Sequence, residues 1–159
     1  MTINYSSGND IIIPTNNTTY RGLKGDDIYV ISKAIPSDAS LTIVDTEGKN
    51  TIQLTDGLEI SSTKFSSSAF QITLSNGAII NISAADKNSY EIGGNITGGI
   101  RVDQKNYLEF SKLFGIQAFP KSGALSGDTN IVIKETSLGS NNIDFSWIEK
   151  TPDSIGLED

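Results

Sequence analysis

Two stretches of the sequence place acidic side chains directly after glycines and before short apolar runs. Residues 6–13 read SSGNDIII and residues 24–31 read KGDDIYVI, so each has a glycine, a polar residue, an aspartate and then β-forming residues. Glycine lets a backbone bend so that carbonyl oxygens face inward, and aspartate adds a charged oxygen. Hard cations such as Ca²⁺ prefer these ligands. The pattern therefore indicates a calcium site, although two acidic surface turns would also use these residues.

The candidate ligands come from these stretches and from two later turns. The first group comprises Gly8, Asn9, Asp10, Gly22, Gly25, Asp26 and Asp27. Weaker candidates are Asp45, Glu47 and Asn50 in DTEGKN and Asp56 in TDG, which are more typical of solvated hairpin turns. DTEGKN lacks the closing glutamate of an EF-hand loop.

These motifs resemble the haemolysin-type calcium-binding repeats of RTX proteins, whose nonapeptide reads GGxGxDxUx with a large apolar residue at U. Gly22, Gly25, Asp27 and Tyr29 match its first, fourth, sixth and eighth positions, and Gly8, Asp10 and Ile12 match the last three of these in the earlier copy. The resemblance implies a parallel β-roll in which the turns of Asp10 and Asp27 stack at one edge and share one Ca²⁺. Leu23 replaces the second glycine, and the intervening PTNNTTY has neither glycine nor aspartate, so at most one full site is implied.

Residues 8 to about 100 also resemble, in general style, the noncatalytic C-terminal modules that follow RTX repeats in type I-secreted bacterial proteins, including adhesins and surface-layer-like proteins. This resemblance implies a secreted or cell-surface location and folding on Ca²⁺ after export. It also implies a structural, surface-attachment or assembly role. The expected partners are calcium and either other domains of a larger parent chain or a cell-surface component.

The composition excludes several other functions. A net charge of −7 opposes nucleic acid, and no apolar window is long enough to span a membrane. Without cysteine or histidine, and without a GxSxG serine, the chain is expected not to be an enzyme. The alternative function is a metal-free β-sandwich that binds carbohydrate or protein. Its stacking surfaces would come from Tyr5, Tyr20, Tyr29, Tyr90, Tyr107 and Trp147.

Short runs rich in Ile, Val, Thr, Phe and Tyr predict a mainly β fold: a short parallel β-roll-like start that runs into a β-sandwich or a β-solenoid of hairpins. One hairpin loop, residues 55–57, would pair Ile52 with Ile60, and another, residues 75–77, would pair Ile72 with Ile80. We favour such repeated hairpins over a continued β-helical coil. The predicted strands are 10–13, 27–32, 41–45, 51–54, 58–61, 69–74, 78–83 and 89–92.

The C-terminal third contains the one predicted helix, near residues 103–115, with Asp103 as its N-cap and Gly115 as its stop. The apolar stripe Tyr107, Phe110, Leu113 and Phe114 would cover the sheet as a lid. The expected organisation is a single domain, 1–159. It comprises RTX-like turns at 8–32, a β-hairpin region at 41–102, the helix within 103–117, two closing strands within 130–150 and a frayed tail at 151–159.

Overall fold

The computed structural model describes residues 2–15, 17–93 and 104–134. Its strands are β1 (Thr2–Asn4), β2 (Ile11–Ile12), β3 (Thr19–Arg21), β4 (Ile28–Ile31), β5 (Ser40–Val44), β6 (Thr51–Leu54), β7 (Glu59–Phe65), β8 (Ala69–Leu74), β9 (Ile79–Ser83), β10 (Ser89–Ile92), β11 (Leu125–Ser126) and β12 (Ile131–Val132). A 3₁₀-helix, η1 (Ala85–Lys87), and an α-helix, α1 (Tyr107–Lys112), complete the described elements. The mainly β fold class is confirmed.

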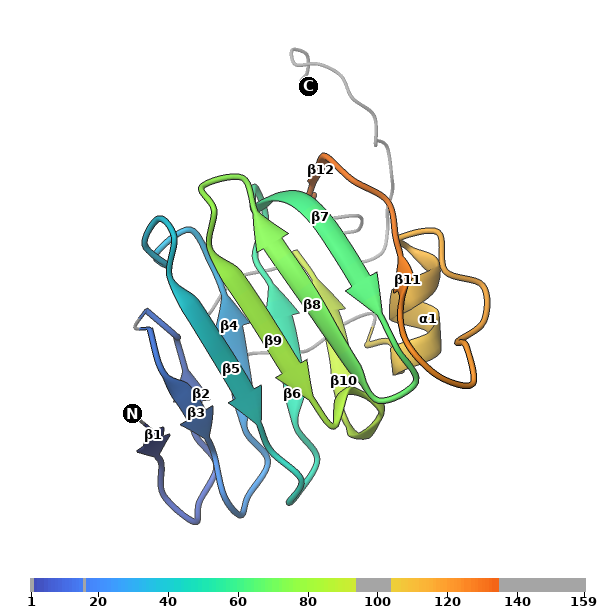
Figure 1. Ribbon diagram of the computed structural model, residues 1–159. Helices are drawn as coiled ribbons and strands as arrows, with labels where there is room; N and C mark the ends of the chain where they lie inside the picture. Colours follow the sequence, from blue (N-terminus) through green and yellow to red (C-terminus); the bar gives the residue numbers. More distant parts are fainter. Residues whose placement is uncertain (1, 16, 94–103, 135–159) are drawn as a thin grey trace, which may run out of the picture.

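The chain alternates between two facing sheets (Figure 1). In one sheet β1, β3, β5 and β9 run parallel, and in the other β2, β4, β6 and β10 run parallel. Ile11 lies opposite Ile28, which lies opposite Thr51, which lies opposite Ser89. The strands thus form four coils of a parallel β-roll: the first coil (β1 and β2), the second coil (β3 and β4), the third coil (β5 and β6) and the fourth coil (β9 and β10).

A hairpin interrupts the winding between the third and fourth coils. Strands β7, β8 and β9 are antiparallel neighbours in the larger sheet, with Ile72 opposite Ile80 and Gln71 opposite Asn81. The Gln71 side-chain amide donates to Asn81 Oδ1 at 2.9 Å. Gly77 takes a φ of 92° in the connecting turn. The register predicted for the 75–77 hairpin is therefore confirmed.

The hairpin predicted at residues 55–57 is wrong. Ile52 in β6 lies opposite Tyr29 and Tyr90, whereas Ile60 in β7 lies opposite Leu74 in the other sheet. The turn instead carries the chain from one sheet to the other. The reason is burial: every residue of β6 is buried, as expected of a strand with parallel neighbours on both sides. The roll therefore continues as a coil through this region.

Alternating side chains of the two sheets meet to form the core. In β8, for example, intermediate and buried residues alternate along the strand, as expected of a sheet with one face packed inward. Fully buried side chains of the two sheets include Tyr20, Leu41, Ile43, Ile80 and Ile82 from the larger and Ile12, Tyr29, Ile31, Ile52 and Leu54 from the smaller. This packing holds the turns between the sheets in register.

Helix α1 is shorter than predicted because its first turn is capped at Asn106. The Asn106 side chain accepts from the Glu109 N–H at 2.8 Å, and Glu109 Oε1 accepts from the Asn106 N–H at 2.8 Å, which forms a capping box. The predicted cap, Asp103, lies outside the described residues. At the other end Gly115 has a φ of 86°, consistent with its predicted role as a stop.

Helix α1 lies beside the part of the larger sheet that extends beyond the smaller sheet (Figure 1), and its aromatic side chains pack against β7 and β8. Phe110 packs at ring-centroid distances of 6.1 Å from Phe65 and 5.3 Å from Phe70. Tyr107 and Phe114 join this cluster, so the predicted lid is present. Leu113, predicted as part of the stripe, is 49% exposed instead.

Two short strands close the larger sheet beside β7. Strand β12 confirms the first predicted closing strand, and β11 falls in a stretch predicted as a loop. The second predicted closing strand, within 143–150, and the tail 151–159 lie outside the described residues. None of the helices in the described ranges is long and apolar enough to cross a membrane.

Candidate functional site

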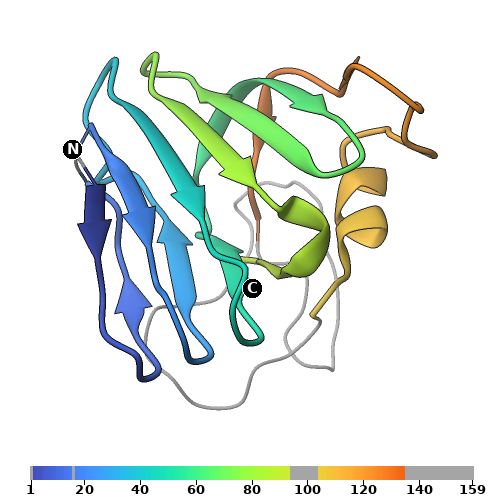
Figure 2. The ribbon, with the colours of Figure 1, turned by 60° about the horizontal axis from the view of Figure 1, so that its bottom comes forward.

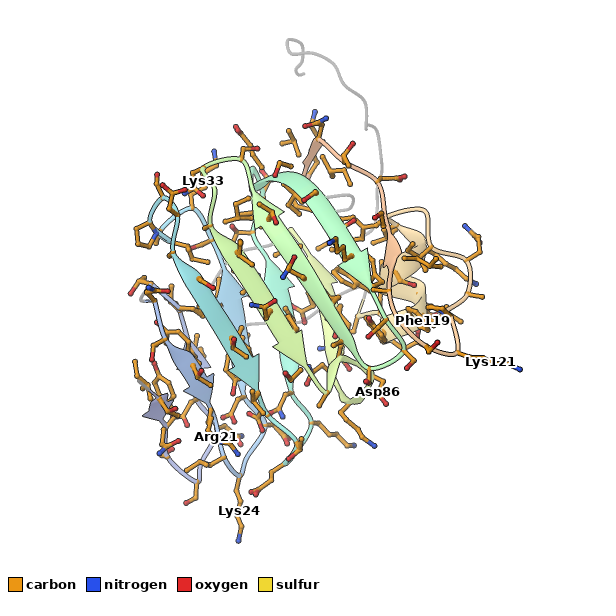
Figure 3. All side chains as sticks on the ribbon, in the orientation of Figure 1. Arg21, Lys24, Lys33, Asp86, Phe119 and Lys121 are labelled. Carbon is orange, nitrogen blue, oxygen red and sulfur yellow. The ribbon has the colours of Figure 1, made fainter. Side chains whose placement is uncertain are left out.

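The turns that lead from the larger sheet to the smaller one lie side by side along one edge of the roll (Figure 2). These turns, residues 5–10, 22–27 and 45–50, form what we call the turn edge. Two backbone hydrogen bonds of 2.9 Å continue the parallel pairing there, from Ile28 N to Asp10 O and from Thr51 N to Asp27 O. The turns of Asp10 and Asp27 therefore stack at one edge. Figure 3 shows Lys24 pointing away from the body of the molecule at this edge.

Acidic and amide side chains cross-link neighbouring turns. Asp27 Oδ1 accepts from the backbone N–H of Asp10 at 2.8 Å, and Asn50 Oδ1 accepts from the N–H of Asp27 at 2.9 Å. In the second and third coils, one such residue thus bonds back to the preceding turn. Each oxygen satisfies a backbone N–H that no strand pairing would otherwise reach.

A second row of side chains bonds in the opposite direction along the edge. Asn9 Oδ1 accepts from the N–H of Asp26 at 2.7 Å, and Asp26 Oδ1 accepts from the N–H of Lys49 at 2.8 Å. These contacts give Asn9 and Asp26 a structural role, because their side-chain oxygens hold adjacent turns together. The aspartates and asparagines of the two rows are therefore the connections of the turn edge as well as candidate ligands.

The glycine positions of the motif leave space for close backbone contact. Gly25 has a φ of 102°, and a Cβ there would overlap the carbonyl group of Gly8 in the preceding coil. Leu23, which replaces a glycine of the nonapeptide, has a φ of 69° in the left-handed region that favours glycine. The backbone at residue 23 thus has the conformation that glycine favours, although the residue there is leucine.

A pair of buried carboxyl groups lies inside the turn edge. The Asp27 side chain is fully buried and Asp45 is 4% exposed, although they come from different coils. The Tyr29 hydroxyl donates to Asp45 Oδ2 at 2.6 Å. A Cβ on Gly22 would overlap Asp27 Oδ2, Asp45 Oδ2 and the Tyr29 hydroxyl oxygen, so these three oxygens converge on the space beside Gly22. We call Asp27 and Asp45 the carboxyl pair.

The electrostatics of the carboxyl pair are unfavourable when both groups are charged. Burial raises the pKa of Asp27 to about 7; the neighbouring Asp45 adds to the rise, and the hydrogen bond from Asp10 N–H opposes it. Burial, and then Asp45, also raise the pKa of Tyr29. Asp27 Oδ2 has no hydrogen-bond partner within the described residues. A proton shared between the two carboxyl groups, or a bound cation, would remove this repulsion.

The remaining candidates lie around this pair or away from it. The Asp10 carboxylate accepts from Ser6 N at 3.1 Å and from Ser6 Oγ at 3.0 and 3.1 Å, within its own turn. Glu47 contributes backbone groups, because its N–H donates to Asp45 Oδ1 at 3.2 Å and its carbonyl accepts from the Asn50 side chain at 2.9 Å. Asp56 lies in the turn between β6 and β7, at the other edge of the roll.

The structure adds Tyr29 to the residues around the carboxyl pair, although the sequence motif assigns it only an apolar role. Tyr29 fills the apolar position of the nonapeptide and its ring is buried, yet its hydroxyl reaches the carboxyl pair. Among the described residues, no group of three or more aspartate, glutamate, cysteine or histidine side chains is arranged to hold a metal ion. Any cation at the carboxyl pair would therefore complete its coordination with hydroxyl, backbone or water oxygens.

Comparisons of the chain with protein-family models, with curated proteins and with solved structures find no significant match.

Proposed function

We propose that this chain is a noncatalytic, calcium-binding module of a secreted bacterial protein. The observation that carries the proposal is the unpartnered Asp27 Oδ2, buried beside Asp45 in a turn that resembles an RTX repeat. The role is structural: Ca²⁺ holds the turns of the roll together, and the module serves surface attachment or assembly of a larger protein.

Coordination chemistry favours a hard cation at this position. Carboxylate and hydroxyl oxygens are the ligands of Ca²⁺, and the chain contains neither cysteine nor histidine to favour a softer metal. Two carboxylates offset the charge of one divalent ion. Because the protein supplies few charged ligands, we expect a dissociation constant of roughly 10⁻⁴–10⁻³ M, the range of extracellular calcium modules.

With this weak affinity, the occupancy of the site would differ between the cytoplasm and the outside of the cell. In a calcium-poor cytoplasm the site stays empty, and the cost of burying two carboxyl groups lowers the stability of the roll. At millimolar extracellular calcium the ion binds the folded state and stabilises it by mass action. Calcium would therefore stabilise the folded roll after export, which fits the proposed secreted or cell-surface location.

The alternative function is a metal-free β-sandwich that binds carbohydrate or protein, and the tyrosine positions give little support to its carbohydrate-binding form. Tyr20, Tyr29, Tyr90 and Tyr107 are all buried, with exposed fractions of 0–4%. Their rings pack in the core and do not form a stacking surface for sugars. Trp147 lies outside the described residues.

Thermal unfolding in EDTA and in Ca²⁺ tests the proposed function. At calcium concentrations ten times the dissociation constant, linkage gives about 1.4 kcal/mol, which corresponds to a rise in midpoint of roughly 3–6 °C for a chain of this size. Asp27→Asn should abolish this rise. In EDTA the variant should be at least as stable as wild type, because the amide keeps an acceptor for Asp10 N–H and removes a buried charge.

The controls separate a specific site from general ionic effects. Mg²⁺ at the same concentration should raise the midpoint less than Ca²⁺, because it demands a tighter octahedral shell and dehydrates reluctantly. A wild-type midpoint that is the same in EDTA and in millimolar Ca²⁺ would show that the module does not bind calcium.

A further inference from the structure

We infer that the ion site lies between the second and third coils, with Asp45 rather than Asp10 as the partner of Asp27. This inference rests on the proposed function and specifies its site. The motif by itself indicates an ion between the first and second coils, where Asp10 and Asp27 occupy equivalent positions. The contacts of the described residues favour the other gap.

The two oxygens of Asp27 face different neighbours. Oδ1 is already bonded to the first coil, through the N–H of Asp10. Oδ2 is unpartnered and lies with Asp45 Oδ2 beside Gly22. A cation that binds the free oxygen of Asp27 therefore meets the third coil.

The two possible partners also differ in burial and in their own contacts. Asp45 is 4% exposed, and its Oδ2 lies at the same space as the free Asp27 oxygen. Asp10 accepts hydrogen bonds from the N–H and the hydroxyl of Ser6 within its own turn. Moving Asp10 into a shared site would break those bonds, whereas Asp45 is already in place.

Gly22 makes this arrangement possible. Gly22 and Asp45 begin the turns that follow β3 and β5, which pair in parallel, so they occupy neighbouring positions in the stack. A side chain at residue 22 would fill the space where the oxygens of Asp27, Asp45 and Tyr29 converge. The proposed site thus uses a glycine in one coil and an aspartate at the equivalent place in the next.

The position of Tyr29 provides a spectroscopic test of the site. Tb³⁺ is a hard oxygen-seeking cation that substitutes for Ca²⁺, and an excited tyrosine ring transfers energy to Tb³⁺ only at short range. The Tyr29 hydroxyl lies at the carboxyl pair, so Tb³⁺ bound there should emit when tyrosine is excited. Replacing Trp147 by phenylalanine in every variant removes tryptophan as a second donor.

The experiment measures Tb³⁺ emission and its displacement by Ca²⁺, with calcium affinity from calorimetry. Asp45→Asn should weaken calcium binding at least about tenfold, and Asp10→Asn should change it less than about twofold. Tyr29→Phe should lose most of the sensitised emission, and it should weaken calcium binding less than Asp45→Asn does, because it removes a neutral oxygen and not a charged one. Circular dichroism checks that each variant is folded; in Asp45→Asn the new amide oxygen keeps an acceptor for the Tyr29 hydroxyl.

The possible failures are distinguishable. If the protein binds calcium but Asp10→Asn weakens binding and Asp45→Asn does not, the site lies between the first and second coils and the inference is overturned. Emission that persists in Tyr29→Phe would also overturn it. Absence of calcium binding in the Trp147→Phe protein would overturn the proposed function itself.

Discussion

Asp27 uses its two carboxylate oxygens in different ways. Oδ1 accepts a hydrogen bond from the Asp10 N–H in the preceding turn, whereas Oδ2 is buried beside Asp45 with no hydrogen-bond partner in the described part of the chain. Burying a carboxylate without a partner costs free energy, and binding a proton or a cation would reduce that cost. The same side chain is therefore a structural connection and the main ligand of the proposed site.

This penalty predicts how stability depends on pH without calcium. The folded-state pKa of Asp27 is raised to about 7, against about 3.9 in an unfolded chain. The folded state therefore binds more protons between these values, and the free energy of unfolding should fall as pH rises from 5 to 8. The chain has no histidine, the side chain whose ordinary pKa lies in this window, so the raised pKa of Asp27 should be visible in the profile.

Urea unfolding in EDTA at pH 5, 6, 7 and 8 measures this dependence. Asp27→Asn should give a flat profile over the same range, and Ca²⁺ should flatten the wild-type profile because it binds the deprotonated pair. An apo protein that is as stable at pH 8 as at pH 5 would mean that the two carboxyl groups do not interact as described.

The sequence motif identifies only some of the residues of the proposed site. The sequence predicted Asp27 as a ligand, because its glycine and its upstream copy are visible. Asp45 was only a weak candidate, since its pairing with Asp27 depends on the third coil stacking on the second. Tyr29 matches the large apolar position of the motif, and the motif does not indicate that its hydroxyl group contacts Asp45.

At the scale of elements, the stacked turns depend on backbone contact between coils. Gly25→Ala would place a Cβ against the Gly8 carbonyl at a φ of 102°, so we expect it to destabilise the protein by about 2–5 kcal/mol. Gly8→Ala is the matched control, because its Cβ would meet Ser6 Oγ at 3.6 Å, an ordinary contact. Chemical denaturation of both variants in EDTA measures the difference. Equal effects of the two substitutions would contradict the stacking of the turns.

Element positions were largely predictable, whereas strand partners were only partly so. The 75–77 hairpin was predicted with its register, because alternation and a three-residue loop agree. The same pattern led to a wrong prediction at residues 55–57. A strand buried between parallel neighbours, such as β6, has the same kind of apolar residues as one strand of a hairpin, so the pattern does not distinguish them. The three-residue strands β1 and β3 are too short to stand out from their polar surroundings, and they are defined by pairing with each other and with β5.

At the scale of the whole molecule, the roll is stabilised differently along its length. Toward the C-terminal end, the larger sheet continues past the fourth coil and is covered by the aromatic side of α1. At the second and third coils the turn edge instead holds a buried pair of acids. A calcium ion between them would add a further link between these two coils, besides the core packing and the hydrogen bonds of the turn edge.

The most direct test of this account is an anomalous difference map from a crystal grown in millimolar Ca²⁺. The account predicts a peak at about 2.3–2.6 Å from an oxygen of Asp27 and an oxygen of Asp45, near the Tyr29 hydroxyl. A peak between Asp10 and Asp27 would place the ion in the wrong gap. A map without a peak, with the two carboxyl groups at hydrogen-bond distance, would show that the pair shares a proton and would contradict the central claim.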